Sequence, residues 1–149
     1  MDTVSFKGLV PNQKYEVTGT LMDKETKKPV EADGKPVTAK ASFKPKESAG
    51  TVEVTFTFDA SSLKGKTVVV FESLAYKDKE VAVHSDIADE GQTIYFPEIE
   101  TTASDSASGT HYAKPEKELT LTDLVEYKNL VPGKEYKLTG TLMDAETEK

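Results

Sequence analysis

The chain has 149 residues, a formal net charge of −7, 36% hydrophobic residues and no cysteine. The lack of cysteine excludes disulfides, thiolate nucleophiles and zinc sites built on cysteine. All basic side chains are lysines, and with the acidic excess this argues against a nucleic-acid partner, because phosphate binding draws on clustered Lys and Arg. The longest apolar run, Thr67–Phe71, is much shorter than the roughly 18 residues of a membrane helix, so we expect no membrane contact from this segment.

The first predicted elements are short strands with alternating apolar and polar residues. The segment Tyr15–Met22 alternates in this way, as a half-buried strand does. The segment Val52–Phe58 alternates as well and follows a turn at Ser48–Gly50.

Further strands are predicted at regular spacing after turn residues such as Gly65, Asp78 and Gly91. They cover Thr67–Leu74, Glu80–Val83, Gln92–Phe96 and a strand that begins at Ile99. The polar segment Ser104–Lys117 fits either a loop between two strands or a disordered linker. Without any helical period, this pattern predicts an all-β fold, an immunoglobulin-like or prealbumin-like β-sandwich.

The beginning of the chain is repeated at its end. Asp2–Lys28 aligns without gaps with Asp123–Lys149, and about 16 of the 27 aligned positions are identical. The longest shared block is T-G-T-L-M-D, at residues 18–23 and 139–144. We therefore predict a window cut from a tandem array: residues 1–98 form one nearly complete repeat, and residues 99–149 form the start of the next.

Glu72 is the first candidate functional residue, because it follows Val68 and Val70 on one face of an apolar strand. A buried carboxylate must be paired, protonated or solvated; an edge-strand glutamate facing water is the alternative. His84 and Asp86 open an acidic loop, which fits a solvated loop better than a metal site or an acid–base pair. The sequence contains no nucleotide-binding, two-histidine metal or Ser-His-Asp pattern, so we expect no cofactor, no metal and no turnover enzyme.

Four motifs nevertheless occur together: I-x-T-T-A with Thr101, D-x-V-x-Y with Asp123 followed by L-T-G-T-L-M-D, V-V-F-E ending at Glu72, and H-x-D-x-x-D-x-x-Q-T with Gln92. In permuted order they resemble the VaFE-repeat family, also called T–Q ester-bond domains, from sortase-anchored adhesins of Gram-positive bacteria. The resemblance covers essentially the whole chain. It implies an extracellular, cell-wall-anchored protein, whose export signal and anchor are expected outside this segment.

The resemblance also implies residue roles. A threonine on the first strand of a repeat condenses with a glutamine on the last strand and expels ammonia; Thr101, with Thr102 as the alternative, is of the nucleophile type and Gln92 is the electrophile. His84 would polarise or protonate the amide. Glu72 would pair with the D-x-V aspartate, which is Asp2 in the first repeat and Asp123 in the second.

These roles leave the cross-link incomplete within one chain. The threonine that belongs with Gln92 is expected before residue 1, and nine residues are too few to bring Thr101 back beside Gln92. Either the first-strand groove stays open, or the Thr101 strand of one copy fills the groove of another. The expected partners are therefore neighbouring repeats and possibly other copies, with host ligands bound by other domains.

The leading functional hypothesis is a structural stalk module whose cross-link limits unfolding, as a disulfide does. The alternative is a ligand-binding adhesin domain that recognises a host glycan or protein through loops, for which only Tyr76, Tyr95 and Tyr112 are plausible exposed aromatic side chains. A third hypothesis, a hydrolytic or transfer enzyme that uses Glu72, Asp2 and His84, would need a substrate cleft.

Overall fold

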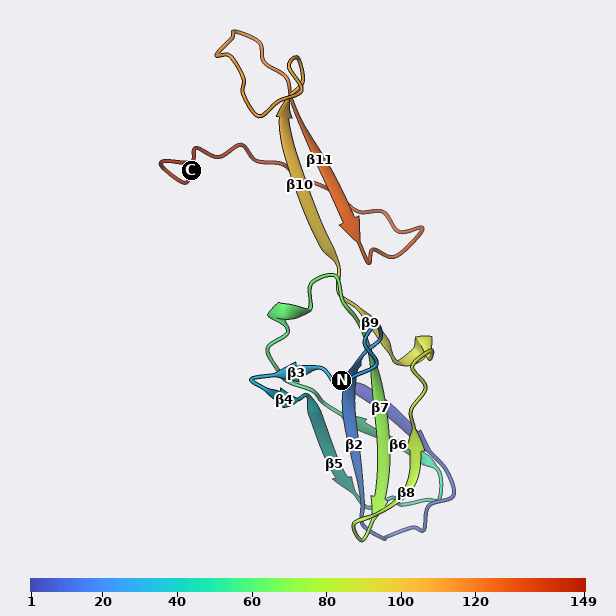
Figure 1. Ribbon diagram of the computed structural model, residues 1–149. Helices are drawn as coiled ribbons and strands as arrows, with labels where there is room; N and C mark the ends of the chain where they lie inside the picture. Colours follow the sequence, from blue (N-terminus) through green and yellow to red (C-terminus); the bar gives the residue numbers. More distant parts are fainter.

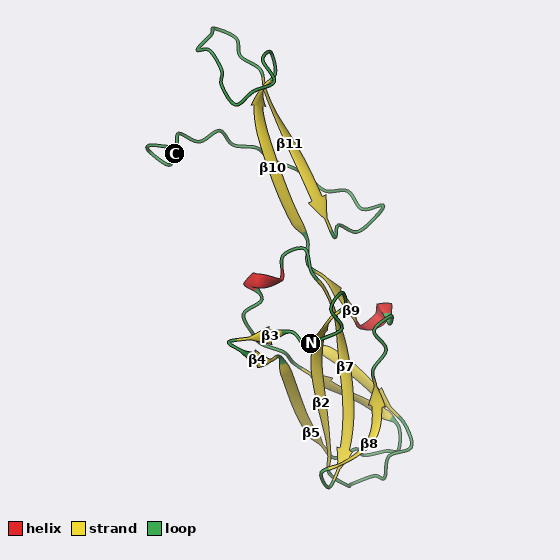
Figure 2. Ribbon diagram, viewed as in Figure 1, coloured by secondary structure: helices red, strands yellow, loops and turns green.

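The computed structural model describes residues 1–149 and confirms the all-β sandwich (Figure 2). The only helical segments are two short 3-10 turns, η1 (Ser61–Leu63) and η2 (Glu90–Gln92). The strands of the first repeat are β1 (Asp2–Phe6), β2 (Tyr15–Asp23), β3 (Glu31–Ala32), β4 (Lys35–Pro36), β5 (Thr38–Phe43), β6 (Gly50–Val54), β7 (Thr67–Tyr76), β8 (Lys79–His84) and β9 (Thr93–Tyr95). The second repeat contributes β10 (Glu98–Asp105) and β11 (Leu121–Lys128). The structure contains no helix with the length and apolar character that crossing a bilayer requires.

The sandwich is built from one larger sheet and a two-stranded ribbon. The larger sheet has the order β5-β2-β7, and β8 and β9 both pair with the remaining edge of β7, one beyond the other. The ribbon pairs β1 with β6, from Asp2 opposite Val54 to Phe6 opposite Gly50. All these pairs are antiparallel, which suits a chain that reverses direction through short turns.

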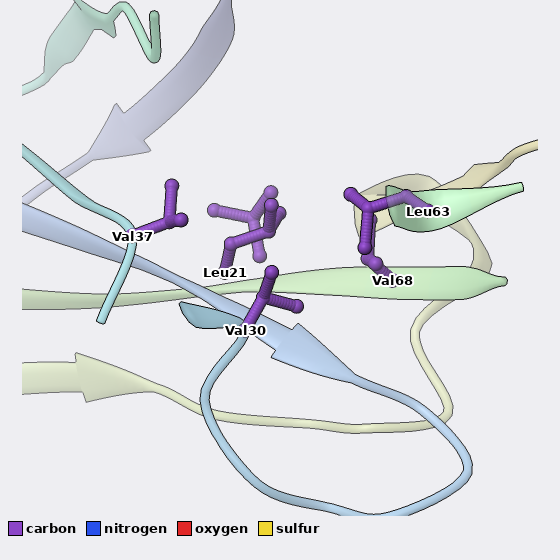
Figure 3. Packing of buried hydrophobic residues seen from close by; sticks show 6 residues of the cluster. Leu21, Val30, Val37, Leu63 and Val68 are labelled. Atoms are coloured by element: carbon purple, nitrogen blue, oxygen red, sulfur yellow. The ribbon is translucent and has the colours of Figure 1, made fainter. Parts of the chain in front are cut away.

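The alternation in β2 places its apolar residues in the core. Tyr15, Val17, Gly19 and Leu21 are buried, and the residues between them are half-buried. One core cluster joins β2 and β7 to the ribbon through Val54, which is fully buried. A second cluster lies at the other end of β2 and contains Leu21, Val30, Val37, Leu63, Val68 and Val70 (Figure 3).

Two predicted strands are shorter in the structure. The strand predicted at Val52–Phe58 ends at Val54, because the ladder with β1 ends at the pair Asp2–Val54. Phe56 and Phe58 still pack against the core, outside the ladder. The strand predicted to begin at Gln92 begins at Thr93, because Gln92 is the last residue of η2.

The second repeat consists of a hairpin that projects from the sandwich (Figure 1). β10 and β11 pair antiparallel over their full length, from Glu98 opposite Lys128 to Asp105 opposite Leu121. The predicted loop after Ser104 is therefore a hairpin connection, although it begins after Asp105 and ends before Leu121. Residues 129–149 contain no strand.

Candidate functional site

Glu72 lies in the interior of the larger sheet. Its Cα is opposite Gly19 on β2 and opposite His84 on β8, and only 5% of the residue is exposed. The edge-strand alternative is therefore wrong. Oε1 of Glu72 and Oδ2 of Asp2 are both buried without a hydrogen-bond partner. Burial, and next the adjacent Asp2 carboxyl group, raise the pKa of Glu72 to about 9, with a smaller contribution from the charge of Asp89. Glu72 therefore holds a proton at neutral pH.

His84 is held by a carboxylate that the sequence did not single out. Its Nε2 lies 2.8 Å from Oδ2 of Asp89. Asp86, the neighbour suggested by the sequence, instead accepts a 2.9 Å hydrogen bond from the backbone N–H of Ala88. The hydrogen bond from His84 and that from the Gly91 N–H hold the pKa of Asp89 below its usual range. In the sequence, only the spacing of the H-x-D-x-x-D-x-x-Q-T loop pointed to a partner for His84, and this spacing is compatible with Asp86 as well as with Asp89.

Asp89 also fixes the backbone that presents Gln92. Its side chain caps η2 by accepting from the Gly91 N–H at 2.8 Å. Its carbonyl oxygen accepts from the backbone N–H of Gln92 at 3.2 Å and from the Thr93 hydroxyl at 2.6 Å. One short loop therefore places His84 and Gln92 through a common residue, in the break between β8 and β9.

Asp2 is next to Glu72 and also lines a cavity with Gln92. This cavity has a volume of about 300 Å³, and Gly91 lines it as well. Strand β1 carries Asp2 on the ribbon, whereas Gln92 ends η2, directly before β9 of the larger sheet. The two layers of the sandwich therefore contribute opposite sides of the site.

An open groove runs beside this site, between the free edges of β1 and β8. It has a volume of about 730 Å³. β1 pairs only with β6 and β8 pairs only with β7, so each strand has one edge without a partner. Val81 and Val83 on β8 are 51% and 61% exposed along the groove. The lining includes Val4, Phe6, Leu9, Glu72, Leu74 and His84.

The structure does not bring Thr101 or Asp123 to this site. Thr101 is opposite Val125, and Asp123 is opposite Ala103, in the projecting hairpin. Both side chains are exposed, as is that of Thr102. β10 has no partner other than β11. Glu72 and His84 thus line the groove, Asp2 and Gln92 line the smaller cavity, and both threonines lie in the hairpin.

The structure contains no group of three or more His, Asp or Glu side chains arranged to hold a metal ion. The arrangement offers a protonated carboxylic acid, a second carboxyl group beside it, an oriented imidazole and a primary amide. These groups suit proton transfer around an acyl centre.

Comparison with known proteins agrees with this chemistry. The family model described as "T-Q ester bond containing domain" matches residues 1–96 and, a second time, residues 97–149. Domains of this kind are typical of extracellular surface proteins. No curated protein matches the chain significantly. The two matches cover the chain from end to end, and they divide it two residues before the boundary predicted at residue 98.

Proposed function

The chain belongs to the T-Q ester bond domain family, and on that premise we propose that it is a stalk module of a bacterial cell-surface adhesin, anchored to the cell wall. Each repeat closes itself with an ester between a threonine on its first strand and a glutamine on its last. The observation that carries the proposal is the buried Glu72 next to Asp2, which shares a cavity with Gln92, together with the His84–Asp89 pair. A buried carboxylic acid can transfer a proton in this reaction.

In the proposed reaction the threonine Oγ attacks the side-chain carbonyl carbon of Gln92. The new C–O bond replaces the C–N bond of the amide, and the nitrogen leaves as ammonia with the proton of the hydroxyl. One carboxyl group of the adjacent Glu72 and Asp2 accepts the hydroxyl proton, and this pair passes a proton on to His84. His84, oriented by Asp89, protonates the departing nitrogen. Neither step needs a metal ion or an external reactant.

The position of the threonine strand follows from the second repeat. β11 is the sequence equivalent of β1, and β10 pairs with β11 so that Thr101 is opposite Val125. A β10-type strand on the free edge of β1 would accordingly place its threonine opposite Val4, which lines the groove with Glu72 and His84. The open groove and the unpartnered carboxyl atoms support this docking site.

We propose that β10 of a second copy also fits this edge. In its own chain β10 belongs to a hairpin with little packing, in which Ile99, Leu124 and Tyr127 are 56%, 62% and 70% exposed. An isolated two-stranded hairpin is marginally stable, whereas the groove offers apolar walls and an unpaired backbone edge. Copies would then associate head to tail, each donating Thr101 to the Gln92 of the next.

The stalk proposal is favoured over ligand binding by the placement of the tyrosines. Tyr76 stacks on Tyr15 at a centroid distance of 5.3 Å, and the Tyr95 hydroxyl donates to Glu90 at 2.6 Å. Tyr112 lies in the far hairpin loop (Figure 1). The three are on separate elements and form no common platform for stacking a sugar.

The decisive experiment completes the repeat with the chain's own sequence. Residues 97–122 are placed ahead of Asp2, so that β10 and its loop precede β1 in the same way as they precede β11 in the second repeat. We expect the intact mass of this extended chain to be lower by one ammonia, because threonine and glutamine now meet in one repeat. Gln92→Ala, with the same fold, should keep its full calculated mass. An extended chain with Gln92 that also keeps its full mass would remove the ester chemistry.

The unextended chain tests exchange between copies. At high concentration we expect covalent oligomers on a denaturing gel, each junction having lost one ammonia, and none for Thr101→Ala. Only monomer of full mass at every concentration would contradict strand donation between copies and would leave the reaction within one extended repeat unaffected.

A further inference from the structure

The joint between the two repeats contains a side chain with an unusual set of contacts. Asn129 directly follows β11, has a left-handed backbone with φ of 62° and is half-buried. Its Nδ2 donates to the carbonyl oxygen of Lys66 at 3.1 Å and to that of Phe96 at 3.0 Å. Both carbonyl groups come from the first repeat.

These two carbonyl groups mark the end of the ladder between β7 and β9. The last pair of that ladder is Thr67–Tyr95, and the Phe96 N–H then donates to the Lys66 oxygen at 2.9 Å. The Asn129 side chain binds the end of this ladder through its two hydrogen bonds to the Lys66 and Phe96 carbonyl groups. The side chain that does so belongs to the next repeat, and the strand it secures is the one that follows Gln92.

A second contact seats the hairpin on the same end of the sandwich. Glu98 and Lys128, which are opposite each other at the base of the hairpin, lie over Gly65 in the turn before β7. Gly65 has a φ of +71°, and a Cβ at this position would meet the Glu98 carboxylate and lie 3.5 Å from Cδ of Lys128. Glycine therefore serves both the left-handed turn and the close approach of the next repeat.

We propose that Asn129 is a clamp that holds consecutive repeats at a fixed angle by binding the second strand of one repeat to the end of the last ladder of the preceding repeat. The chemistry requires an amide, because two carbonyl oxygens converge on one group that must present two N–H donors. An aspartate of the same shape would present oxygen to both and repel them. The left-handed backbone suits asparagine and does not depend on the clamp, since Gly8, the equivalent residue of the first repeat, has a φ of +80°.

This inference goes beyond the proposed cross-link, since it concerns contacts between repeats that require no ester. It fixes the orientation of the second repeat relative to the first at this joint, whereas Gly8, at the equivalent position of the first repeat, has no side chain that could act in this way. A joint with this clamp resists bending at the site where β9 ends, so the next repeat supports the strand that directly follows Gln92.

The test measures, in the full chain, how widely the distance between the sandwich and the hairpin varies. The chain has no cysteine of its own, so a spin label attaches only to cysteines that are introduced. We choose Thr38→Cys on β5 and Glu126→Cys on β11, both at exposed positions. Pulsed dipolar spectroscopy then gives the distance distribution between sandwich and hairpin. We expect one narrow distribution for the labelled parent, and a distribution at least twice as wide for Asn129→Asp and for Asn129→Gly.

The matched control is Asn12→Gly. Asn12 also has a left-handed backbone, with φ of 66°, but lies in a loop away from the joint, where its backbone N–H donates to the carbonyl oxygen of Pro45. Its replacement should leave the distribution unchanged, as should Gln92→Ala, which removes any ester. Unchanged widths in both Asn129 variants would overturn the clamp, and an unchanged thermal midpoint in each variant would show that the fold is intact.

Discussion

At the scale of single residues, Glu72 and Asp89 show what the sequence pattern can and cannot predict about the site. Its position on an apolar face predicted that it is paired, protonated or solvated, and the structure buries it beside Asp2 with a raised pKa. Asp89 was not predictable in the same way. Its bond to His84 depends on the turn η2, which brings residues 84 and 89 together, and the sequence alone does not distinguish it from Asp86.

The raised pKa of Glu72 has a consequence for stability. In the folded chain Glu72 stays protonated up to about pH 9, whereas in the unfolded chain it ionises near its ordinary value of 4.5. The unfolded state therefore binds fewer protons between these values, and the stabilisation present below pH 4.5 is lost as the pH rises towards 9. We expect the free energy of unfolding to fall by up to about 1.4 kcal/mol per pH unit in this window.

The measurement is urea unfolding of the parent chain and of Glu72→Gln between pH 5 and pH 9. The variant should lose most of this pH dependence, whatever its absolute stability, because glutamine does not titrate. Glu53→Gln, at an exposed position on β6, is the control and should keep the parental slope. Parallel pH profiles for the parent and Glu72→Gln would show that Glu72 ionises alike in the folded and unfolded chains.

At the scale of elements, the two copies of one sequence adopt different structures. Residues 15–23 form β2, whereas the equivalent residues 136–144 form no strand. Leu21 is 4% exposed and its equivalent Leu142 is 84% exposed. The local turns are nonetheless the same: Asp23 and Asp144 each accept two backbone N–H groups, at 2.8 and 3.1 Å, from the residues two and three positions later.

Gly19 and its equivalent Gly140 test this difference in packing between the two copies. A Cβ on Gly19 would lie 2.5 Å from Cζ of Phe56, whereas a Cβ on Gly140 would meet nothing within 4 Å. We expect Gly19→Ala to destabilise the fold by about 1–3 kcal/mol, because the core must shift around the added methyl group. Gly140→Ala should change stability by less than about 0.5 kcal/mol. Both values come from chemical unfolding, and equal effects of the two substitutions would contradict the packing described for β2.

At the scale of the whole molecule, the chain is a packed sandwich joined to a hairpin through a small joint. The repeat pattern predicted both parts and placed the boundary near residue 98. Which residues make the joint was not predictable, because the equivalent of Asn129 in the first repeat is Gly8. The contact also depends on two carbonyl groups that are far apart in sequence, at residues 66 and 96.

Hydrogen exchange should separate the packed part from the rest. The blocks at residues 18–23 and 139–144 have the same sequence, so the intrinsic exchange rates within them are matched. We expect strong protection in the first block, which lies between β5 and β7, and nearly none in the second. NMR-detected exchange on the full chain measures both at once. Comparable protection in the two blocks would mean that residues 136–144 find a partner strand in solution.

The sequence by itself determined the strand periodicity, the turns, the repeat and the unusual position of Glu72 on an apolar face, because these depend on residues near one another in the chain or on the polarity of a single face. Only the tertiary structure decided which segments become strands, which carboxylate orients His84, and which strand edges remain without a partner. A β-strand is completed by hydrogen bonds to another segment. One sequence, T-G-T-L-M-D, is therefore a core strand between two partners and an extended, exposed segment without them.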